Sequence, residues 1–305
     1  MRIVSLLPST TEILFALGAG DHVIGVTFEC DYPAEARTRR VVSTSALPEG
    51  LTPAQIDAAV SAKMAAGEDI YHLDEGALRE LDPELIVTQD LCAVCAVDVS
   101  TVGAALAHLG CDGRVLTIDP GRLVEVIDSI GTLGRATDCE TRAAELSASL
   151  HARLNAVAAA VAGRPRPRVA IVEWTDPLFS AGHWVPDMVT AAGGECVLGA
   201  PGEYSGPVTP EQLRDSGAEL VVVSPCGYDL AGAHQLANDL LERDILLPGT
   251  PVWAVDADAA YVRPGPRLVD GVEALAALCH PGVLPDRPDL AAFVGTMPAA
   301  TAASR

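Results

Sequence analysis

The sequence predicts an α/β protein with two Rossmann-like lobes, each built around a parallel sheet, joined by one long bridging helix. Short apolar runs of strand length alternate with helical segments along the whole chain, which is the pattern of parallel sheets covered by helices. A helical stretch without proline then separates two such halves. A chain of 305 residues is long enough for both halves to bury cores of their own.

The predicted strands are short runs rich in Val, Ile and Leu, namely 2–7, 23–26, 85–88, 115–118, 169–173, 220–224 and 252–255. Helix starts are marked by capping residues between them. Thr52-Pro53-Ala54-Gln55 and Thr209-Pro210-Glu211-Gln212 each place Thr at the N-cap, Pro at N1 and Gln at N3. Ser9 and Glu12 have the spacing of a capping box. Recurrence of the same helix start in both halves fits a duplicated lobe or chance equally well.

The stretch between the halves, from Leu123 to about Ala162, is rich in Ala, Leu, Glu and Arg. A continuous helix of this length would span about 60 Å, enough to cross from one lobe to the other, although Gly131 and Gly134 could bend it. We therefore predict an N-terminal lobe (1–121), a bridging helix (122–163), a C-terminal lobe (164–282) and a flexible tail (283–305).

Composition limits the partners. The chain has 41 acidic and 20 basic residues, a net charge of −21, so its surface repels phosphate backbones and we expect no nucleic-acid partner. No apolar run reaches the ~18 residues that a membrane helix needs, so no membrane insertion is expected. The first strand begins at Arg2, which leaves no room for a secretory signal and predicts a cytoplasmic location. In that compartment the eight cysteines would be free thiols or metal ligands.

Polar and aromatic residues follow the predicted strands. Ligands of open parallel sheets bind beyond the carboxyl ends of the strands, and two facing lobes would present those ends to a shared cleft. Aromatic walls with a few polar groups are typical of ligand sites, and a helix N-terminus behind Pro8 and Ser9 could hold a polar or anionic group. The candidate ligand-binding residues are Pro8, Ser9, Glu29, Tyr32, Gln89, Asp90, Trp174, Phe179, His183, Trp184, Tyr204, Tyr228 and Arg263.

Cys92 and Cys95 form a C-x-x-C motif, which is typical of zinc sites and of redox dithiols. A zinc ribbon would need a second such motif, which the sequence lacks. The candidate metal ligands are the thiols at strand ends, Cys30, Cys92, Cys95 and Cys226, with Glu29 or His183 completing a mixed zinc or iron site. Unliganded thiols and redox chemistry remain the alternatives. Cys111, Cys139, Cys196 and Cys279 are predicted to be packing residues. His183 beside Trp184 is equally well read as a hydrogen-bonded structural histidine.

Several segments resemble the cobalamin and iron-siderophore type of ABC-transporter solute-binding protein. They are Ile3–Leu14, Cys30–Pro33 and Leu81–Val87, and the match extends over residues 2–281. Thr88–Cys95, Ala181–Trp184, Pro225–Tyr228 and Arg263–Arg267 resemble a signal-less branch labelled cobalamin-binding protein, although Phe28 stands where that branch has His. The resemblance implies two α/β lobes joined by a rigid helix, a corrinoid as ligand and an ABC permease as partner.

The leading hypothesis is therefore a solute-binding protein, not an enzyme, that holds a corrinoid (cobalamin-like) or other metal chelate in a cleft between two lobes. The sequence contains no nucleophile elbow, Walker loop, dinucleotide fingerprint or HExxH motif. The alternative is a cytosolic metal-thiolate protein or enzyme that uses the cleft cysteines. A third hypothesis is a scaffold-like remnant that binds little.

Overall fold

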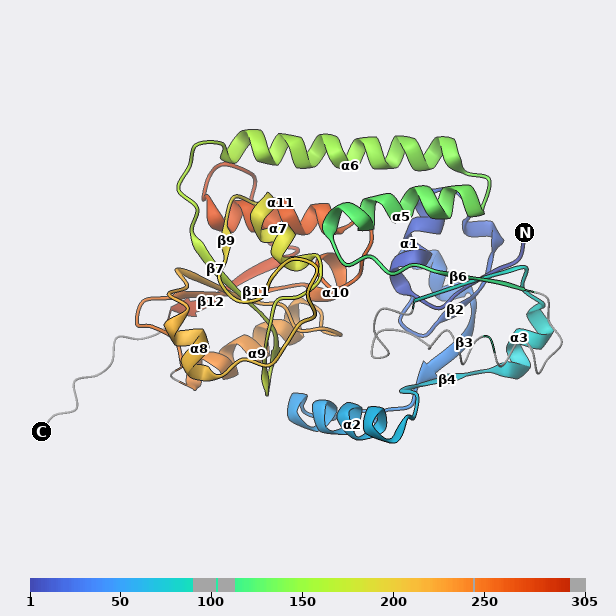
Figure 1. Ribbon diagram of the computed structural model, residues 1–305, viewed down its shortest axis with the longest axis horizontal. Helices are drawn as coiled ribbons and strands as arrows, with labels where there is room; N and C mark the ends of the chain where they lie inside the picture. Colours follow the sequence, from blue (N-terminus) through green and yellow to red (C-terminus); the bar gives the residue numbers. More distant parts are fainter. Residues whose placement is uncertain (90–102, 104–112, 244, 297–305) are drawn as a thin grey trace, which may run out of the picture. The chain divides into compact units, whose positions relative to one another are not determined.

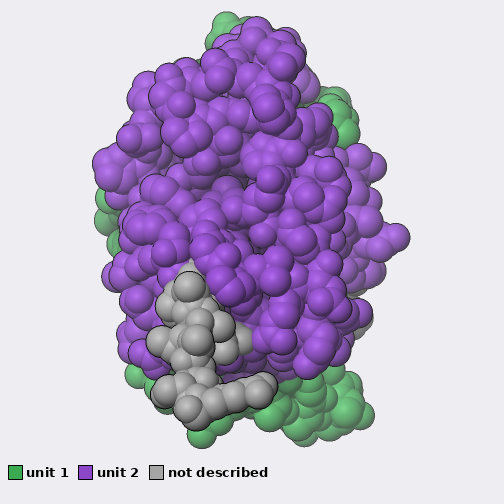
Figure 2. Space-filling model, turned by 90° about the vertical axis from the view of Figure 1, so that its left-hand side faces the viewer, with its two compact units in different colours: residues 1–120, 124–149 green, residues 121–123, 150–305 purple. Residues whose placement is uncertain are grey.

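The computed structural model describes residues 1–89, 103, 113–243 and 245–296 (Figure 1). The chain divides into two compact units, which Figure 2 colours separately. Residues 1–120 and 124–149 form the first unit, and residues 121–123 and 150–305 form the second. Each unit is described below by itself.

The first unit contains a six-stranded sheet with the order β4-β3-β2-β1-β5-β6. All neighbouring strands are parallel except β3 and β4, which are antiparallel. Apolar side chains such as Val4, Ile86 and Leu78 are fully buried around this sheet. The strands are β1 (Ile3–Ser5), β2 (Val23–Thr27), β3 (Arg40–Ser45), β4 (Tyr71–Leu73), β5 (Leu85–Thr88) and β6 (Arg114–Thr117). The helices among its described residues are α1 (Pro8–Ala16), α2 (Pro53–Ala66), α3 (Glu75–Leu81) and α5 (Leu123–Ala136), with 3₁₀ turns η1 (Gly20–His22) and η2 (Ala34–Thr38).

The second unit contains a sheet with the order β12-β11-β10-β7-β8, and the short strand β9 also pairs with β7. Its central strands are parallel, whereas the outer strands β8 and β12 are antiparallel to their neighbours. Helices α7 and α11 cover one face and α8 and α9 the other (Figure 1). The strands are β7 (Arg168–Thr175), β8 (Leu178–Ser180), β9 (Glu195–Cys196), β10 (Leu220–Val223), β11 (Pro251–Val255) and β12 (Ala291–Thr296). The helices are α7 (Val185–Ala191), α8 (Pro210–Asp215), α9 (Leu230–Glu242), α10 (Ala257–Ala260) and α11 (Leu268–Cys279).

The predicted single bridging helix over 122–163 is two helices, α5 and α6 (Glu140–Val161). The break lies at Asp138, whose φ of 56° is in the left-handed region that cannot continue a right-handed helix. Gly134 allows the two helices to approach closely, because a Cβ there would lie 2.5 Å from the Cβ of Ala143. α6, with 22 residues and a length of about 33 Å, begins in the first unit and ends in the second.

The tail prediction is also corrected, because residues 291–296 of the segment predicted to be flexible form β12. This strand pairs along its length with β11, and the Phe293 ring packs edge-on against Trp253 at 5.2 Å between centroids. The cross-strand aromatic contact and the backbone ladder order a segment whose composition alone suggested fraying. Residues 297–305 lie outside the described part of the chain.

The helix starts at Thr52 and Thr209 are confirmed, since both form complete capping boxes with the predicted Gln. The capping box predicted at Ser9 is wrong. α1 begins two residues earlier than that capping box requires, with Leu7 at the N-cap and Pro8 in the first turn, and Leu7 has no side chain that could cap the helix. In the part of the chain that the structure describes, no helix has both the length and the apolar character needed to cross a bilayer.

Candidate functional site

Two aromatic residues lie together at the carboxyl ends of neighbouring strands in the second unit. Trp174 lies near the end of β7, and Tyr228 follows β10. Their ring centroids are 6.0 Å apart at an interplanar angle of 61°, an edge-on contact. The Trp174 indole donates a hydrogen bond to the Asp176 carbonyl at 3.1 Å, which fixes the ring, and Phe179 lies opposite Trp174 in the β7–β8 ladder. Parallel pairing of β7 with β10 therefore creates this aromatic pair, as the strand-end argument predicts.

His183 is held in the left-handed region, with φ of 50°, in the loop between β8 and α7. Its backbone N–H donates to Glu203 O at 2.6 Å, and its carbonyl accepts from Gly202 N at 2.9 Å. Tyr204 packs edge-on against the imidazole, with ring centroids 5.1 Å apart. The two reciprocal backbone bonds thus place the His183 and Tyr204 side chains next to each other.

The imidazole of His183 is in an unusual electrostatic setting. Its Nε2 atom is buried and has no hydrogen-bond partner among the described residues. Burial lowers the pKa of His183, so the ring is neutral at pH 7. An unsatisfied buried polar atom costs about 1–3 kcal/mol, and such an atom in a native structure requires an explanation. A neutral imidazole without a protein partner has the chemistry of a ligand for a metal or a polar group.

Trp184 is a core residue despite its predicted place among ligand contacts. It is 7% exposed, and its indole N–H donates to Tyr261 O at 2.7 Å. Its ring lies 5.6 Å from that of His183. Trp184 therefore packs behind His183 and supports its position, and a direct ligand contact by Trp184 stays a prediction.

Glu173 is a residue of this region that sequence reasoning missed. It lies on β7, and its carboxylate accepts the Gly182 N–H at 3.0 Å, directly beside His183. Burial raises the pKa of Glu173 to about 7, more than the hydrogen bonds with Gly182 and Ser205 lower it. A signal was available, because Glu173 is the only charged residue of the predicted strand 169–173.

Arg263 and Cys226, two further predicted site residues of the second unit, have partners outside the His183–Tyr204 pair. The Arg263 side chain is largely buried, with its guanidinium 3.7 Å from the carboxylate of Asp258. Cys226 is exposed, and its backbone N–H donates to Glu173 O at 3.4 Å. The structure therefore places Cys226 at the same sheet end as Trp174 and Tyr228.

In the first unit, Ser9 and Cys30 are buried near the start of α1. The hydroxyls of Ser5, Thr10 and Thr11 form a buried network in which Ser5 Oγ lies 2.7 Å from Thr10 Oγ1 and 2.9 Å from Thr11 Oγ1. Thr11 Oγ1 is also 3.1 Å from Cys30 Sγ. Pro8 occupies the first turn of α1 and is only half-buried. This part of the predicted site is a hydroxyl cluster with a buried thiol.

The remaining candidates of the first unit differ in exposure. Tyr32 is exposed, Glu29 is half-buried and Gln89 is buried directly after β5. Phe28 was noted in the sequence only because the similar cobalamin-binding branch has His at this position. Its side chain is exposed, and its ring centroid lies 6.4 Å from that of Tyr71. It supplies an aromatic surface that sequence reasoning missed. Asp90, Cys92 and Cys95 lie outside the described residues.

The described residues therefore do not form the predicted metal site of Cys30, Cys92, Cys95 and Cys226. Cys30 and Cys226 belong to different units. Within the ranges that the structure describes, no group of three or more His, Cys, Asp or Glu side chains could hold a metal ion. Because Cys92 and Cys95 are not among these residues, their metal binding stays a prediction.

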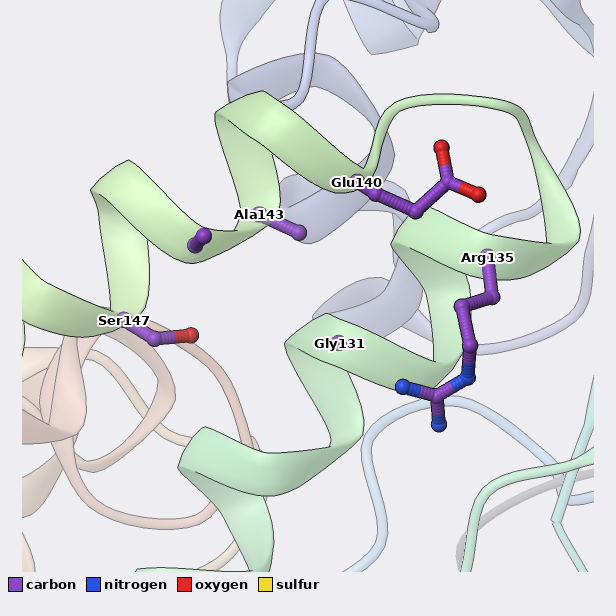
Figure 3. Close-up of a pocket in the computed structure, with 6 residues that line it drawn as sticks. Gly131, Arg135, Glu140, Ala143 and Ser147 are labelled. Carbon is purple, nitrogen blue, oxygen red and sulfur yellow. The ribbon is translucent and has the colours of Figure 1, made fainter.

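Two small cavities lie away from the candidate residues. One of ≈ 180 Å³ lies between α5 and α6 and is lined by Gly131, Arg135, Glu140, Ala143, Ala144 and Ser147. Figure 3 shows that the Arg135 and Glu140 side chains extend away from each other there. A second, of ≈ 220 Å³, lies beside Trp253 and Arg287 in the second unit. Ligand pockets usually occupy about 300–1,000 Å³, so neither cavity alone suits a large ligand.

Two α/β units built on parallel sheets, together with the family match below, identify a substrate-binding protein of the ABC-transporter class. The chain belongs to the periplasmic binding protein family, which matches residues 3–248. It is similar to the uncharacterized ABC transporter substrate-binding lipoprotein YvrC of Bacillus subtilis, with 26% identity covering 92% of this chain and 80% of the relative. It is also similar to the vitamin B12-binding protein of Salmonella choleraesuis, with 23% identity covering 88% and 86% of the two chains.

Solved structures share the fold. The vitamin B12-binding protein BtuF of Vibrio cholerae aligns with a TM-score of 0.62 and 21% identity, covering 90% of this chain and 95% of that chain. A periplasmic heme-binding protein of Pseudomonas aeruginosa aligns with a TM-score of 0.68 and 21% identity, covering 98% and 99%. The predicted two-lobe α/β fold and the family resemblance are confirmed.

These comparisons also decide two other predictions. The chain is a substrate-binding protein rather than an enzyme, in keeping with its family and fold. The predicted cytoplasmic location is wrong, because the relatives are periplasmic or lipoprotein substrate-binding proteins, which implies a place outside the cytoplasm. That prediction relied on where the sequence begins, which does not determine the compartment of a family member.

Proposed function

We propose that this protein binds a metal tetrapyrrole, a corrinoid in the first place, and delivers it to an ABC permease. The observation that carries the proposal is the neutral, half-buried imidazole of His183, whose buried Nε2 atom lacks a protein partner among the described residues. The aromatic residues Trp174, Tyr204 and Tyr228 lie in the same unit beyond the strands or in the loops beside them. The relatives named vitamin B12-binding proteins support the same ligand class.

The residue types suit a flat macrocycle that carries a metal. Aromatic rings pack against the faces and edges of a macrocycle, which buries apolar area without requiring many hydrogen bonds. An imidazole nitrogen is a suitable axial ligand for cobalt or iron only when it is not protonated, and burial keeps His183 in that state. Tyr204 packs on the imidazole and is 66% exposed, so it is the side chain that could rotate to admit the ligand.

Haem is the second candidate. His and Tyr side chains both serve as axial ligands of haem iron, and here His183 and Tyr204 lie with ring centroids 5.1 Å apart. Heme-binding proteins are among the solved structures that share the fold. The two ligands can be separated by their absorption spectra.

The test is a titration of the purified protein with hydroxocobalamin, whose axial position exchanges, with cyanocobalamin, whose axial cyanide exchanges poorly, and with haemin. We expect binding with a shifted visible spectrum for hydroxocobalamin or haemin. His183→Asn removes the imidazole while keeping a residue type that tolerates a positive φ, and it should abolish the shift. His234→Asn, on α9, is the matched control and should behave as wild type.

Failure of all three chromophores to bind at micromolar concentration would contradict the proposed function. A wild-type spectrum in the His183→Asn protein would leave tetrapyrrole binding in place and exclude coordination by His183.

A further inference from the structure

The β7–β8 ladder is irregular at one residue, Glu173. Its register shifts between Val172 and Trp174, so that Glu173 lies in a bulge between two regularly paired residues. Bulges redirect a side chain out of the regular alternation of a strand and often occur beside functional sites. Here the carboxyl group of Glu173 is turned to the Gly182 backbone, where it accepts the N–H at 3.0 Å.

The Glu173 carboxyl also contacts a second loop. It forms a hydrogen bond with the Ser205 side chain, whose hydroxyl in turn donates to Ser180 O at 2.7 Å. The two loops touch backbone to backbone at this point, because a Cβ on Gly182 would lie 2.7 Å from Ser205 Cα and closer still to Ser205 N. One carboxyl group therefore bonds to both loops where they meet.

We propose that Glu173 is the positioning residue of this ligand-facing loop pair: by joining Gly182 to Ser205 it sets the positions of the neighbouring side chains His183 and Tyr204. Each hydrogen bond of Glu173 goes to a residue next in sequence to one of these side chains: Gly182 precedes His183, and Ser205 follows Tyr204. The His183 N–H to Glu203 O bond and the Gly202 N–H to His183 O bond complete the connection between the loops. The hydrogen bonds of Glu173 go to Gly182 and Ser205, so it acts on His183 and Tyr204 through the backbone.

Proton counting indicates which form of Glu173 does this best. Ser205 has a single hydroxyl proton, and that proton is directed at Ser180 O. A bond donated by Ser205 favours the ionised carboxylate and lowers the pKa of Glu173, but it would require the hydroxyl proton to leave Ser180 O. With that proton on Ser180 O, a protonated Glu173 accepts from Gly182 with one oxygen and donates to Ser205 with the other. An ionised Glu173 would compete with Ser180 for the same hydroxyl proton. Desolvation of the carboxyl group also favours the neutral acid.

The experiment compares Glu173→Gln with Glu173→Ala. Glutamine has the shape and the donor–acceptor pair of the neutral acid, whereas alanine removes both bonds. In the protein without ligand, we expect the Gly182 amide to lose hydrogen-exchange protection, and the His183 imidazole NMR signals to shift, in Glu173→Ala only. Affinity for hydroxocobalamin, a readout that rests on the proposed function, should fall at least tenfold in Glu173→Ala and less than threefold in Glu173→Gln. Glu242→Ala, an exposed site on α9, is the control.

Unchanged Gly182 protection and His183 signals in a folded Glu173→Ala protein would overturn the proposal, as would a Glu173→Gln protein that behaves like Glu173→Ala. If Glu173→Ala does not fold, Ser205→Ala provides the second route. The Ser205→Ala protein should show shifted His183 imidazole NMR signals while the Gly182 amide stays protected from exchange. Unchanged His183 signals would count against the positioning role of Glu173. A wild-type protein that binds none of the chromophores would defeat the proposed function, while the exchange data would still decide the role of Glu173.

Discussion

Arg122 and Asp187 form a two-pronged ion pair although they are 65 residues apart in the sequence. Arg122 Nε and Nη2 donate to the two Asp187 carboxylate oxygens at 2.7 and 2.8 Å. The same carboxylate accepts the backbone N–H of Leu123, the first residue of α5, at 3.1 Å. A side chain from the first turn of α7 thus satisfies a helix N-terminus elsewhere in the chain, and residues 121–123 group with the second unit.

Replacing Asp187 with alanine should lower the free energy of unfolding by about 1–2 kcal/mol, because it removes a charge-assisted pair and a helix-capping bond together. Asp187→Asn should lose less, since an amide oxygen can still accept from Leu123. Urea denaturation measures both effects. Asp239→Ala on the exposed surface of α9 is the control, and a loss in Asp187→Ala no larger than in this control would refute the prediction.

Stability should depend on pH through Glu173. Its pKa is about 7 in the folded protein against 4.5 for an ordinary glutamate, so between these values the folded state keeps a proton that the unfolded state has lost. Stability from this group therefore falls as pH rises from about 4.5 to about 7, by about 3 kcal/mol in total, and is constant above that.

The measurement is the difference in unfolding free energy between wild type and Glu173→Gln across this pH range. His183, whose pKa is lowered by burial, contributes a slope of the opposite sign, but it is present in both proteins and cancels. Cys196, the thiol whose own pKa Glu173 helps to raise, has a pKa of about 11 and does not titrate in this range. A pH-independent difference would show that Glu173 is ionised in the folded protein.

The sequence predicts those site residues whose positions follow from strand periodicity. Trp174 and Tyr228 each follow an apolar run, and the parallel pairing of those runs brings them together. The contact between His183 and Tyr204 depends on two irregular loops joined by backbone bonds, for which no periodic pattern exists. Glu173 was missed because a bulge, visible only in the strand pairing, redirects its side chain. The interruption of the long helix at Asp138 likewise depends on one backbone conformation.

Arg153 should contribute strongly to the stability of the second unit. Its guanidinium bonds to both Glu273 oxygens at 2.8 and 2.7 Å and to Asp270 at 2.7 Å, which joins α6 to α11. Arg153→Met leaves two partly buried carboxylates close together, so we expect a loss of about 2 kcal/mol that shrinks at high salt. Arg153→Lys should recover only part of it, because an ammonium cannot form the paired bonds.

Thermal or urea denaturation at low and high salt tests this prediction. Arg164→Met is the control, because Arg164 is exposed, follows the end of α6 and donates to the Ala160 carbonyl in the last turn of that helix. Equal losses in the two variants would show that the Arg153 pairs add nothing beyond an ordinary surface arginine.

Glycine at position 182 should be required for the arrangement of the two loops. The backbone of Gly182 lies so close to Ser205 that a methyl group there would overlap with the Ser205 nitrogen and α-carbon. Neither neighbour is the end of a flexible side chain, so Gly182→Ala must push the loops apart and stretch the Glu173 bond to the residue 182 amide. We expect a loss of about 1–3 kcal/mol of stability and at least a tenfold lower affinity for hydroxocobalamin. Gly206→Ala is the control and should change neither quantity, because a Cβ added there would meet no atom within 4 Å. Wild-type affinity in Gly182→Ala would show that ligand binding does not depend on how these loops meet.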